Sequence, residues 1–146
     1  QRQMCIRDRN HRVQKFSPNG ELITQFGARN GGRGQLAYPT DVAVDSDGDV
    51  YVCDWTSNGI NPGMVQIFSQ DGEFLASLSG SAQMLSKWGQ DWVDANPDVI
   101  KARRLVNSTE PEWRFAMPRG ILFDLRERRL LITDTQRCRI QIYQKI

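Results

Sequence analysis

The chain has 146 residues, of which 39% are hydrophobic and 25% are charged, and its formal net charge is +2. This composition is typical of an ordinary globular domain. A charge so close to neutrality gives little support to a nucleic-acid partner, and because no apolar run approaches the ~20 residues that span a bilayer, a membrane is not indicated either.

The first nine residues do not follow the pattern of the rest. Near the end of the chain, Arg139 follows Asp134 by five positions at the start of a predicted strand, whereas Asp8 lies only four positions before the matching Arg12. Two interpretations stay open. In the first, the segment is not native, because it resembles the adapter-derived peptides found at the termini of some proteins translated from short-read assemblies. In the second, residues 6–8 form a genuine strand with a shortened loop.

Residues 10–26 predict a β-hairpin. Val13–Phe16 and Leu22–Phe26 are strand-sized runs separated by a polar turn. Asn19-Gly20 in that turn supplies residues that accept the positive φ angles of a hairpin connection.

The glycine-rich segment Gly27–Gly34 is easily mistaken for a phosphate-binding loop. Such loops lead from a strand into a helix and, in the P-loop type, end in Gly-Lys-Ser/Thr, whereas a strand follows here without a lysine. We interpret the segment as a connector between two repeats.

The stretch from Tyr38 to Gly80 predicts a complete antiparallel meander. Asp-Gly, a strong hairpin signal, lies in two of the three gaps between its four strand-sized runs. The runs are Val42–Val44, Val50–Cys53, Val65–Phe68 and Phe74–Leu78.

The remaining gap, between the second and third runs, is a long loop from Trp55 to Gly63 that offers candidate binding residues. Trp55, Asn58 and Asn61 would contact a ligand there, because loops rather than the scaffold usually carry binding. The alternative is a turn-rich loop in which Trp55 packs on its neighbour.

After Gly80 the apolar spacing changes from that of strands to that of helices. Ser81 is suited to cap a first helix, and Asn96-Pro97-Asp98 is a start signal for a second. We expect a helical hairpin at 81–107 and a polar linker up to residue 114. The apolar positions are Met84, Leu85, Trp88, Trp92, Val93, Val99, Ile100, Ala102, Leu105 and Val106.

Residues 115–146 repeat the first three strands of the meander. Pro118–Asp124 matches Pro39–Asp45, Leu131–Asp134 matches Tyr51–Asp54, and Arg139–Tyr143 matches Met64–Phe68. Residues 12–22 likewise match the third and fourth strands. The chain therefore divides into an atypical segment at 1–9, repeats at 10–80, the insert and linker at 81–114 and a three-stranded repeat at 115–146, or about two and a half copies.

The matching segments of the preceding paragraph, in this order, resemble the NHL repeat, which is a blade of a β-propeller. The resemblance implies an all-β fold, here a partial β-propeller of about two and a half four-stranded antiparallel blades with a helical hairpin insert. It also implies six blades, so we expect a fragment of a longer protein whose remaining blades cover the apolar faces that one thin sheet cannot bury alone. The implied structural positions are Pro39, Asp45, Asp54, Pro118, Asp124, Asp134 and Arg139.

The alternating direction of the predicted strands places the candidate binding residues at one end of the sheets. In a meander, the second-to-third and blade-to-blade connections emerge at the same end, and here these are the long ones. We expect Asp54, Asp134 and Arg139 at this end to bond loop backbone or bridge blades rather than to catalyse. The candidate binding residues are Trp55, Asn58, Asn61, Arg119 and Arg137, with the helical insert beside them.

The leading hypothesis is a non-catalytic binding or scaffolding propeller, with an unknown protein or small molecule as ligand and without a cofactor. The carboxylates fall mostly in tight turns, where backbone bonding explains them, and no Ser/His/Asp set is visible. The three cysteines are an odd number without a Cys-x-x-Cys pair, and there is only one histidine, so the ligand spacing of a zinc site is not seen. The sequence does not determine the compartment.

Two alternatives stay open. One is a propeller enzyme of the lactone hydrolase or peptide-amidating lyase kind, which by resemblance uses metal held in the channel; the inner strands offer Asp41, but Gly120 stands at the matching place. The other is an RNA-binding member of the family, to which a net charge of +2 and a pI near 8.6 give little support.

Overall fold

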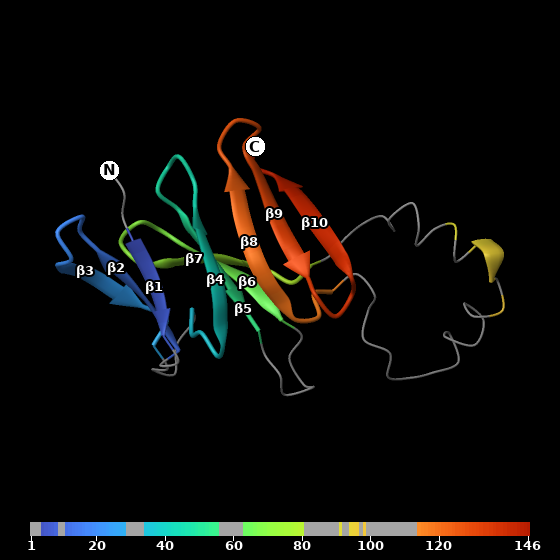
Figure 1. The fold of residues 1–146 in the computed structure, drawn as a ribbon, viewed down its shortest axis with the longest axis horizontal. Coiled ribbons are helices and arrows are strands. Elements are labelled where there is room, and N and C mark those ends of the chain that lie inside the picture. The colour runs from blue at the N-terminus through green and yellow to red at the C-terminus, as the bar shows by residue number, and fades with distance from the viewer. Residues whose placement is uncertain are drawn as a thin grey trace.

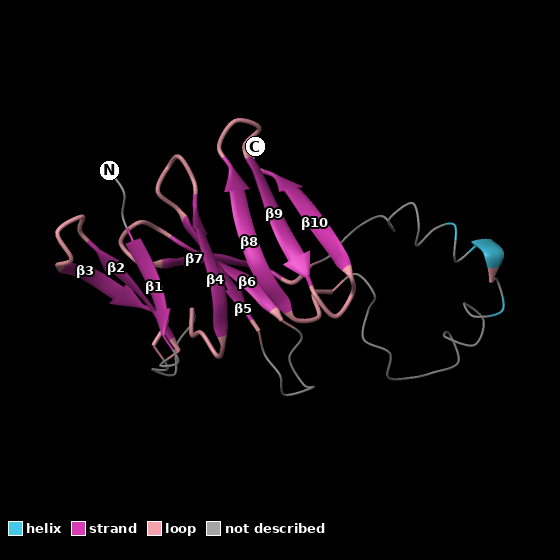
Figure 2. Ribbon diagram, in the orientation of Figure 1, coloured by secondary structure: helices cyan, strands magenta, loops and turns pink. Residues whose placement is uncertain are grey.

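The computed structural model describes residues 4–8, 11–28, 34–55, 63–80 and 114–146, together with residues 91, 94–96 and 98. The described part forms three antiparallel sheets, which we call the first, central and last sheets (Figures 1 and 2). The expected all-β architecture is thus confirmed for these residues. The first sheet contains β1 (Met4–Asp8), β2 (Arg12–Phe16) and β3 (Leu22–Phe26); the central sheet contains β4 (Pro39–Val44), β5 (Val50–Asp54), β6 (Met64–Phe68) and β7 (Phe74–Leu78); the last sheet contains β8 (Pro118–Asp124), β9 (Arg129–Asp134) and β10 (Arg139–Gln144).

The central sheet is the predicted meander, with its strands in sequence order. Val52 in β5 lies opposite Val42 of β4 and opposite Gln66 of β6. The inner strand β4 begins at Pro39, three residues before the predicted run, and its register shifts between Pro39 and Asp41. The same shift occurs between Pro118 and Gly120, so the two copies share an irregular first strand.

The hairpin turns differ from the expected type. Gly20 and Gly72 have φ angles of 86° and 89°, but Asn19 does not have a positive φ. The pairing also shifts by one residue next to each turn, at Lys15/Phe16 and at Ile67/Phe68. The connections are therefore longer turns that end in one left-handed glycine and a bulge, rather than two-residue turns with two positive φ angles.

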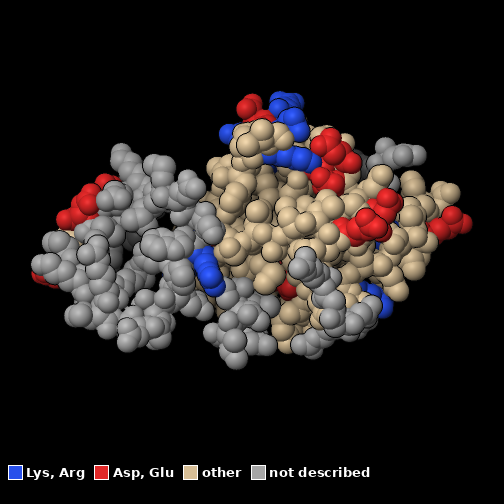
Figure 3. Space-filling view, turned by 180° about the vertical axis from the view of Figure 1, so that it is seen from behind, with Lys and Arg blue, Asp and Glu red and all other residues tan. Residues whose placement is uncertain are grey.

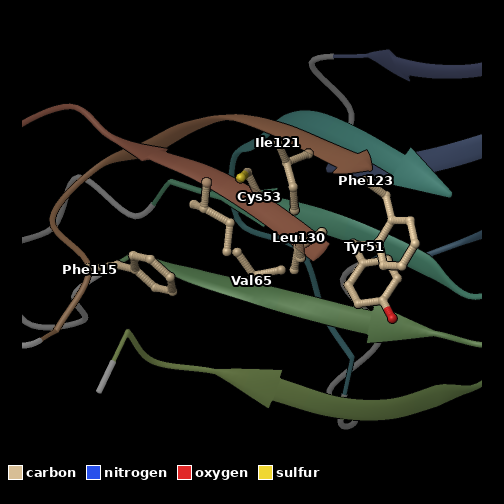
Figure 4. Packing of buried hydrophobic residues seen from close by; sticks show 8 residues of the cluster. Tyr51, Cys53, Val65, Phe115, Ile121, Phe123 and Leu130 are labelled. Atoms are coloured by element: carbon tan, nitrogen blue, oxygen red, sulfur yellow. The ribbon is translucent and has the colours of Figure 1, made fainter. Parts of the chain in front are cut away.

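Two apolar clusters hold the three sheets together, because alternate residues of a strand point to opposite faces. The first cluster, between the first and central sheets, contains Val13, Phe26, Leu36, Val50, Val52 and Phe68. The second cluster, between the central and last sheets, contains Tyr51, Cys53, Val65, Phe115, Ile121, Phe123, Leu130 and Ile132 (Figure 4). The central sheet is thus covered on both faces, and β5 is buried along its whole length.

The helical hairpin predicted at 81–107 lies mostly outside the described residues and stays a prediction. Of that segment, Asp91, Asp94, Ala95 and Asp98 are helical. At the other end of the chain, β1 supplies the strand that the second interpretation of the first nine residues requires, and it pairs with β2 from Met4 to Asp8. No helix among the described residues is long and apolar enough to cross a membrane.

Candidate functional site

At one end of the sheets, which we call the connector end, the strand order predicts the long connections. It contains the β1–β2 and β9–β10 turns, the start of β4 and β8, and the end of β5, and it is the lower end in Figure 1. The tight turns lie at the opposite end. On the side seen in Figure 3, the described charged side chains gather mostly toward the tight-turn end.

An aromatic row crosses the connector end from the first sheet to the last. The ring of His11, in the β1–β2 turn, meets the ring of Tyr38 edge-on at 5.4 Å, and Tyr38 meets Trp55 at 6.1 Å. The guanidinium carbon of Arg119, in β8, lies 5.4 Å from the centroid of the Trp55 ring. We call these four residues the aromatic row.

The aromatic row contains exposed side chains and polar groups that lack a partner among the described residues. Tyr38 is 44% exposed and Arg119 is exposed too. Within the described part of the chain, Arg119 forms no ion pair, and the indole N–H of Trp55 finds no acceptor. A cation on an aromatic face is stabilised by the ring quadrupole, and its remaining N–H groups stay available to a ligand.

Asp54 fixes the geometry beneath the row. Its carboxylate accepts hydrogen bonds from the backbone N–H groups of Ala37, at 3.0 Å, and Tyr38, at 2.6 Å, and from the side chain of Gln66 at 3.2 Å. The backbone N–H of Trp55 then donates to the Tyr38 carbonyl at 2.9 Å. The carboxylate therefore holds the Tyr38 backbone, and the bond from Trp55 to the Tyr38 carbonyl places these two residues side by side.

Asp134 does the same in the last sheet. It is fully buried and accepts from the Ala116 N–H at 2.7 Å and from Nε of Arg139 at 3.0 Å. Burial raises the pKa of Asp134 above its ordinary value, and the bonds from Ala116 and Arg139 offset this only in part. Both aspartates are thus occupied by their own connectors.

The inner strands are tied to each other by Asp41. Its carboxylate accepts from the backbone N–H of Ile121 in β8 at 2.9 Å and from its own neighbour Val42 at 3.0 Å. The hydroxyl of Thr40 donates to the Pro118 carbonyl at 3.0 Å. The repeat pattern gave no signal for this tie, because Gly120 stands at the position that matches Asp41.

A second group missed by sequence reasoning lies at the tight-turn end. The ammonium of Lys145 contacts the carboxylates of Asp45, Asp47 and Asp49 in the β4–β5 turn, and Asp45 also accepts from the Tyr51 hydroxyl at 2.9 Å. Burial and the bond to Asp45 raise the pKa of Tyr51 to about 12. The lysine follows the last predicted strand, so no motif pointed to it.

The remaining candidates divide into three groups. Arg137 lies at the connector end in the β9–β10 turn, where its charge acts to lower the pKa of Asp134. Asn58 and Asn61 lie outside the described residues. Pro39 and Pro118 open β4 and β8, and Asp45 and Asp124 accept backbone N–H bonds from the turns that follow them.

The cysteines do not form a site in the described part. Cys53 and Cys138 are both free thiols, and burial raises the pKa of Cys53 to about 12, with the charges of Asp41 and Asp54 adding to the effect. No group of three or more His, Cys, Asp or Glu side chains among the described residues is placed to hold a metal ion.

Part of the central sheet matches a known family of repeats. The family model described as NHL repeat matches residues 36–59, which include β4, β5, Tyr38 and Trp55. No curated protein matches the chain in sequence. The matched stretch is the same one that carries the Asp54 bonds to the connector. Residues 36–59 of the chain therefore correspond to an NHL repeat.

Proposed function

We propose that the chain is part of a β-propeller that serves as a non-catalytic binding module, and that it binds a protein or small ligand at its connector end. The observation that carries this proposal is the aromatic row, because it spans all three sheets and ends in an arginine without an ion-pair partner in the described structure. The six blades that the resemblance implies, and the helical insert, belong to the same proposal.

The residue types of the row support a recognition role. Tyrosine, tryptophan and arginine are the side chains that most often dominate the energy of a protein interface. The backbone of Tyr38 donates to Asp54 and the backbone of Trp55 donates to the Tyr38 carbonyl, so little backbone freedom is lost here when a partner binds. A rigid, partly exposed aromatic surface with one available cation is suited to binding.

The carboxylates at the same end give no comparable support to catalysis. Asp41, Asp54 and Asp134 each accept backbone N–H bonds, so their oxygens are engaged in holding connectors and inner strands. A general base must reach the proton that it abstracts, and these groups are directed at the protein itself. The binding function is therefore preferred over the propeller enzyme.

The test is a selection of binders from a displayed peptide library and a fragment library, followed by affinity measurement on Trp55→Ala and Arg119→Ala. We expect each substitution to weaken the selected binders by about tenfold or more, as for a central interface residue. Arg126→Ala, which removes an exposed arginine at the tight-turn end, is the matched control and should leave affinity unchanged. Binders that keep their affinity for the Trp55→Ala/Arg119→Ala double variant would remove this end from consideration.

A further inference from the structure

The two ends of the sheets differ in the charge that they expose. At the tight-turn end, carboxylates are exposed in each of the turns β2–β3, β4–β5, β6–β7 and β8–β9. These are Glu21, Asp47, Asp71, Glu73 and Glu127. Exposed arginines such as Arg126 and Arg128 lie among them, and on the side seen in Figure 3 both signs of charge gather there. The tight-turn end is therefore of mixed charge.

The connector end exposes positive charge. Arg119 in β8 and Arg114, just before that strand, are both exposed. The described carboxylates at this end are not: Asp54 is 2% exposed and Asp134 is 0% exposed. Asp41 is half-buried, and its oxygens accept backbone N–H bonds. Because the charge that reaches the surface here comes from arginines, an approaching anion is attracted to this end.

Arg119 is held in place by the ring of Trp55. Its guanidinium carbon lies 5.4 Å from the ring centroid, and the Trp55 backbone is bonded to the Tyr38 carbonyl. A guanidinium that stacks on an aromatic ring is already oriented, so it loses less freedom when it forms hydrogen bonds to a partner. This contact joins the central sheet to the last one, so it does not depend on what lies beyond either outer sheet.

The polar groups without a partner in this part of the aromatic row can only donate hydrogen bonds. They are the indole N–H of Trp55, which finds no acceptor, and the N–H groups of Arg119, which forms no ion pair among the described residues. A carboxylate only accepts hydrogen bonds, and its two oxygens match the planar fork of an arginine. The ring of Tyr38, 44% exposed and 6.1 Å from that of Trp55, offers an aromatic surface beside them.

We propose that the connector end recognises an acidic peptide segment of a partner protein, in which an Asp or Glu carboxylate pairs with Arg119 and a neighbouring apolar side chain packs on Tyr38. The proposal rests on the binding function proposed above and names the class of its partner. The charge on the protein and the charge on the peptide are complementary, and the aromatic rings supply the apolar part of the contact.

A nucleic-acid strand fits the same surface less well. Binding to a phosphate backbone requires several cations placed along the strand, and each of them adds to the affinity. The aromatic row contains one exposed arginine, and the buried carboxylates of Asp54 and Asp134 lie at the same end of the sheets. One cation beside aromatic rings is suited to a single carboxylate rather than to a chain of phosphates.

The test begins with selection from a random displayed peptide library on the wild-type chain and on Arg119→Gln, which removes the charge and keeps a polar side chain. Among the wild-type binders we expect enrichment of Asp or Glu next to an apolar residue, and we expect Arg119→Gln to lose this enrichment. Arg126→Gln, at an exposed position of the tight-turn end, is the matched control and should keep it.

A selected peptide is then compared with its Asp→Asn or Glu→Gln counterpart on both chains by fluorescence anisotropy. On the wild-type chain the amide peptide should bind about tenfold more weakly, because a charged hydrogen-bond acceptor has been removed. On Arg119→Gln the two peptides should bind alike, since the two changes remove the same contact. The wild-type preference should also shrink between about 50 mM and about 300 mM salt, which screens an exposed ion pair.

Three results would overturn the acidic partner and still leave a binding site at the connector end. The first is a set of peptides that lose affinity on Trp55→Ala without any enrichment of Asp or Glu. The second is an amide peptide that binds the wild-type chain as tightly as the carboxylate peptide. The third is an oligouridylate that binds more tightly than every selected peptide and loses affinity on Arg119→Gln. Binders that are unaffected by Trp55→Ala and Arg119→Ala would instead overturn the binding function, and the acidic partner with it.

Discussion

One aspartate position performs the same structural task in two repeats with different partners. Asp54 and Asp134 each accept the N–H of an alanine two residues before the proline that opens the inner strand. Arg139 completes the bonding of Asp134, whereas Gln66 donates to Asp54 in the central sheet, where methionine replaces the arginine. A carboxylate is needed at this position because it accepts several hydrogen bonds at once, and the identity of the third donor is free to vary.

Lys145, which follows β10 of the last sheet, forms ion pairs with carboxylates of the β4–β5 turn and so links the last sheet to the central sheet. Burial alone would raise the pKa of Asp45, but hydrogen bonds from Lys145 and Tyr51 and from the turn backbone lower it below its ordinary value of 3.8. Burial alone would lower the pKa of Lys145, but its bonds to Asp45, Asp47 and Asp49 raise it above its ordinary value of 10.5.

These shifts predict how stability depends on pH. Because the folded-state pKa of Asp45 is depressed, its contribution is fully present above the unfolded value near 3.8 and is lost as pH falls through the lower folded value. Because the folded-state pKa of Lys145 is raised, its contribution is fully present below 10.5 and is lost as pH rises through the higher folded value. Lys145→Met should therefore destabilise the chain most between these limits and least at the two extremes.

Urea unfolding of the wild type and of Lys145→Met at a series of pH values measures this difference. Lys101→Met, which removes a lysine with the same change of charge elsewhere in the sequence, is the control. A difference in unfolding free energy that stays constant down to pH 2 would show that Asp45 and Lys145 are not coupled as described.

At the scale of elements, each connector is fastened to the preceding sheet by one apolar side chain. Leu36 and Phe115 lie three residues before Pro39 and Pro118, and both are 0% exposed. Their backbone N–H groups donate to the carbonyls of Gly27 and Ser79, each at 2.9 Å. The connector is therefore a packed part of the interface between sheets.

Phe115→Ala should destabilise the chain by about 3–5 kcal/mol, because it removes a fully buried aromatic ring and leaves a cavity between two sheets. Leu125→Ala, at a 61% exposed position in the β8–β9 turn, should change stability by no more than about 0.5 kcal/mol. Equilibrium unfolding in guanidinium chloride of both variants measures the effects. Equal stabilities of the two variants would show that the connector is not fastened by this ring.

Strand positions were predictable because the pattern occurs more than once, and contacts made by single residues were not. Repeated Asp-Gly turns and apolar runs located β5, β6 and β7 to within a residue. Asp41 and Lys145 bind across sheets, and neither has a counterpart that a comparison of repeats could reveal. The meeting of Trp55 with Arg119 was equally hidden, because the two residues come from different repeats and only the packing of β4 beside β8 brings them together.

Stability is unevenly distributed among the three sheets because, in the described ranges, only the central sheet is covered on both faces. Its strand β5 is paired on both sides and contributes to both apolar clusters. The outer sheets each have one uncovered face, and β10 is an edge strand of the last sheet. In repeat architectures each unit depends on its neighbours, so the end units are the least stable.

This distribution predicts an order of amide hydrogen exchange in the monomer. Amides of Val50–Asp54 should exchange slowest, because freeing β5 requires both clusters to open, which is equivalent to global unfolding. Amides of Arg139–Gln144 should exchange faster, through local opening of an edge strand whose outer face is uncovered. Hydrogen–deuterium exchange of the wild-type chain, followed by mass spectrometry, measures this order. Equal exchange rates in β5 and β10 would show that the three sheets unfold as one unit and that the uncovered face has no local effect.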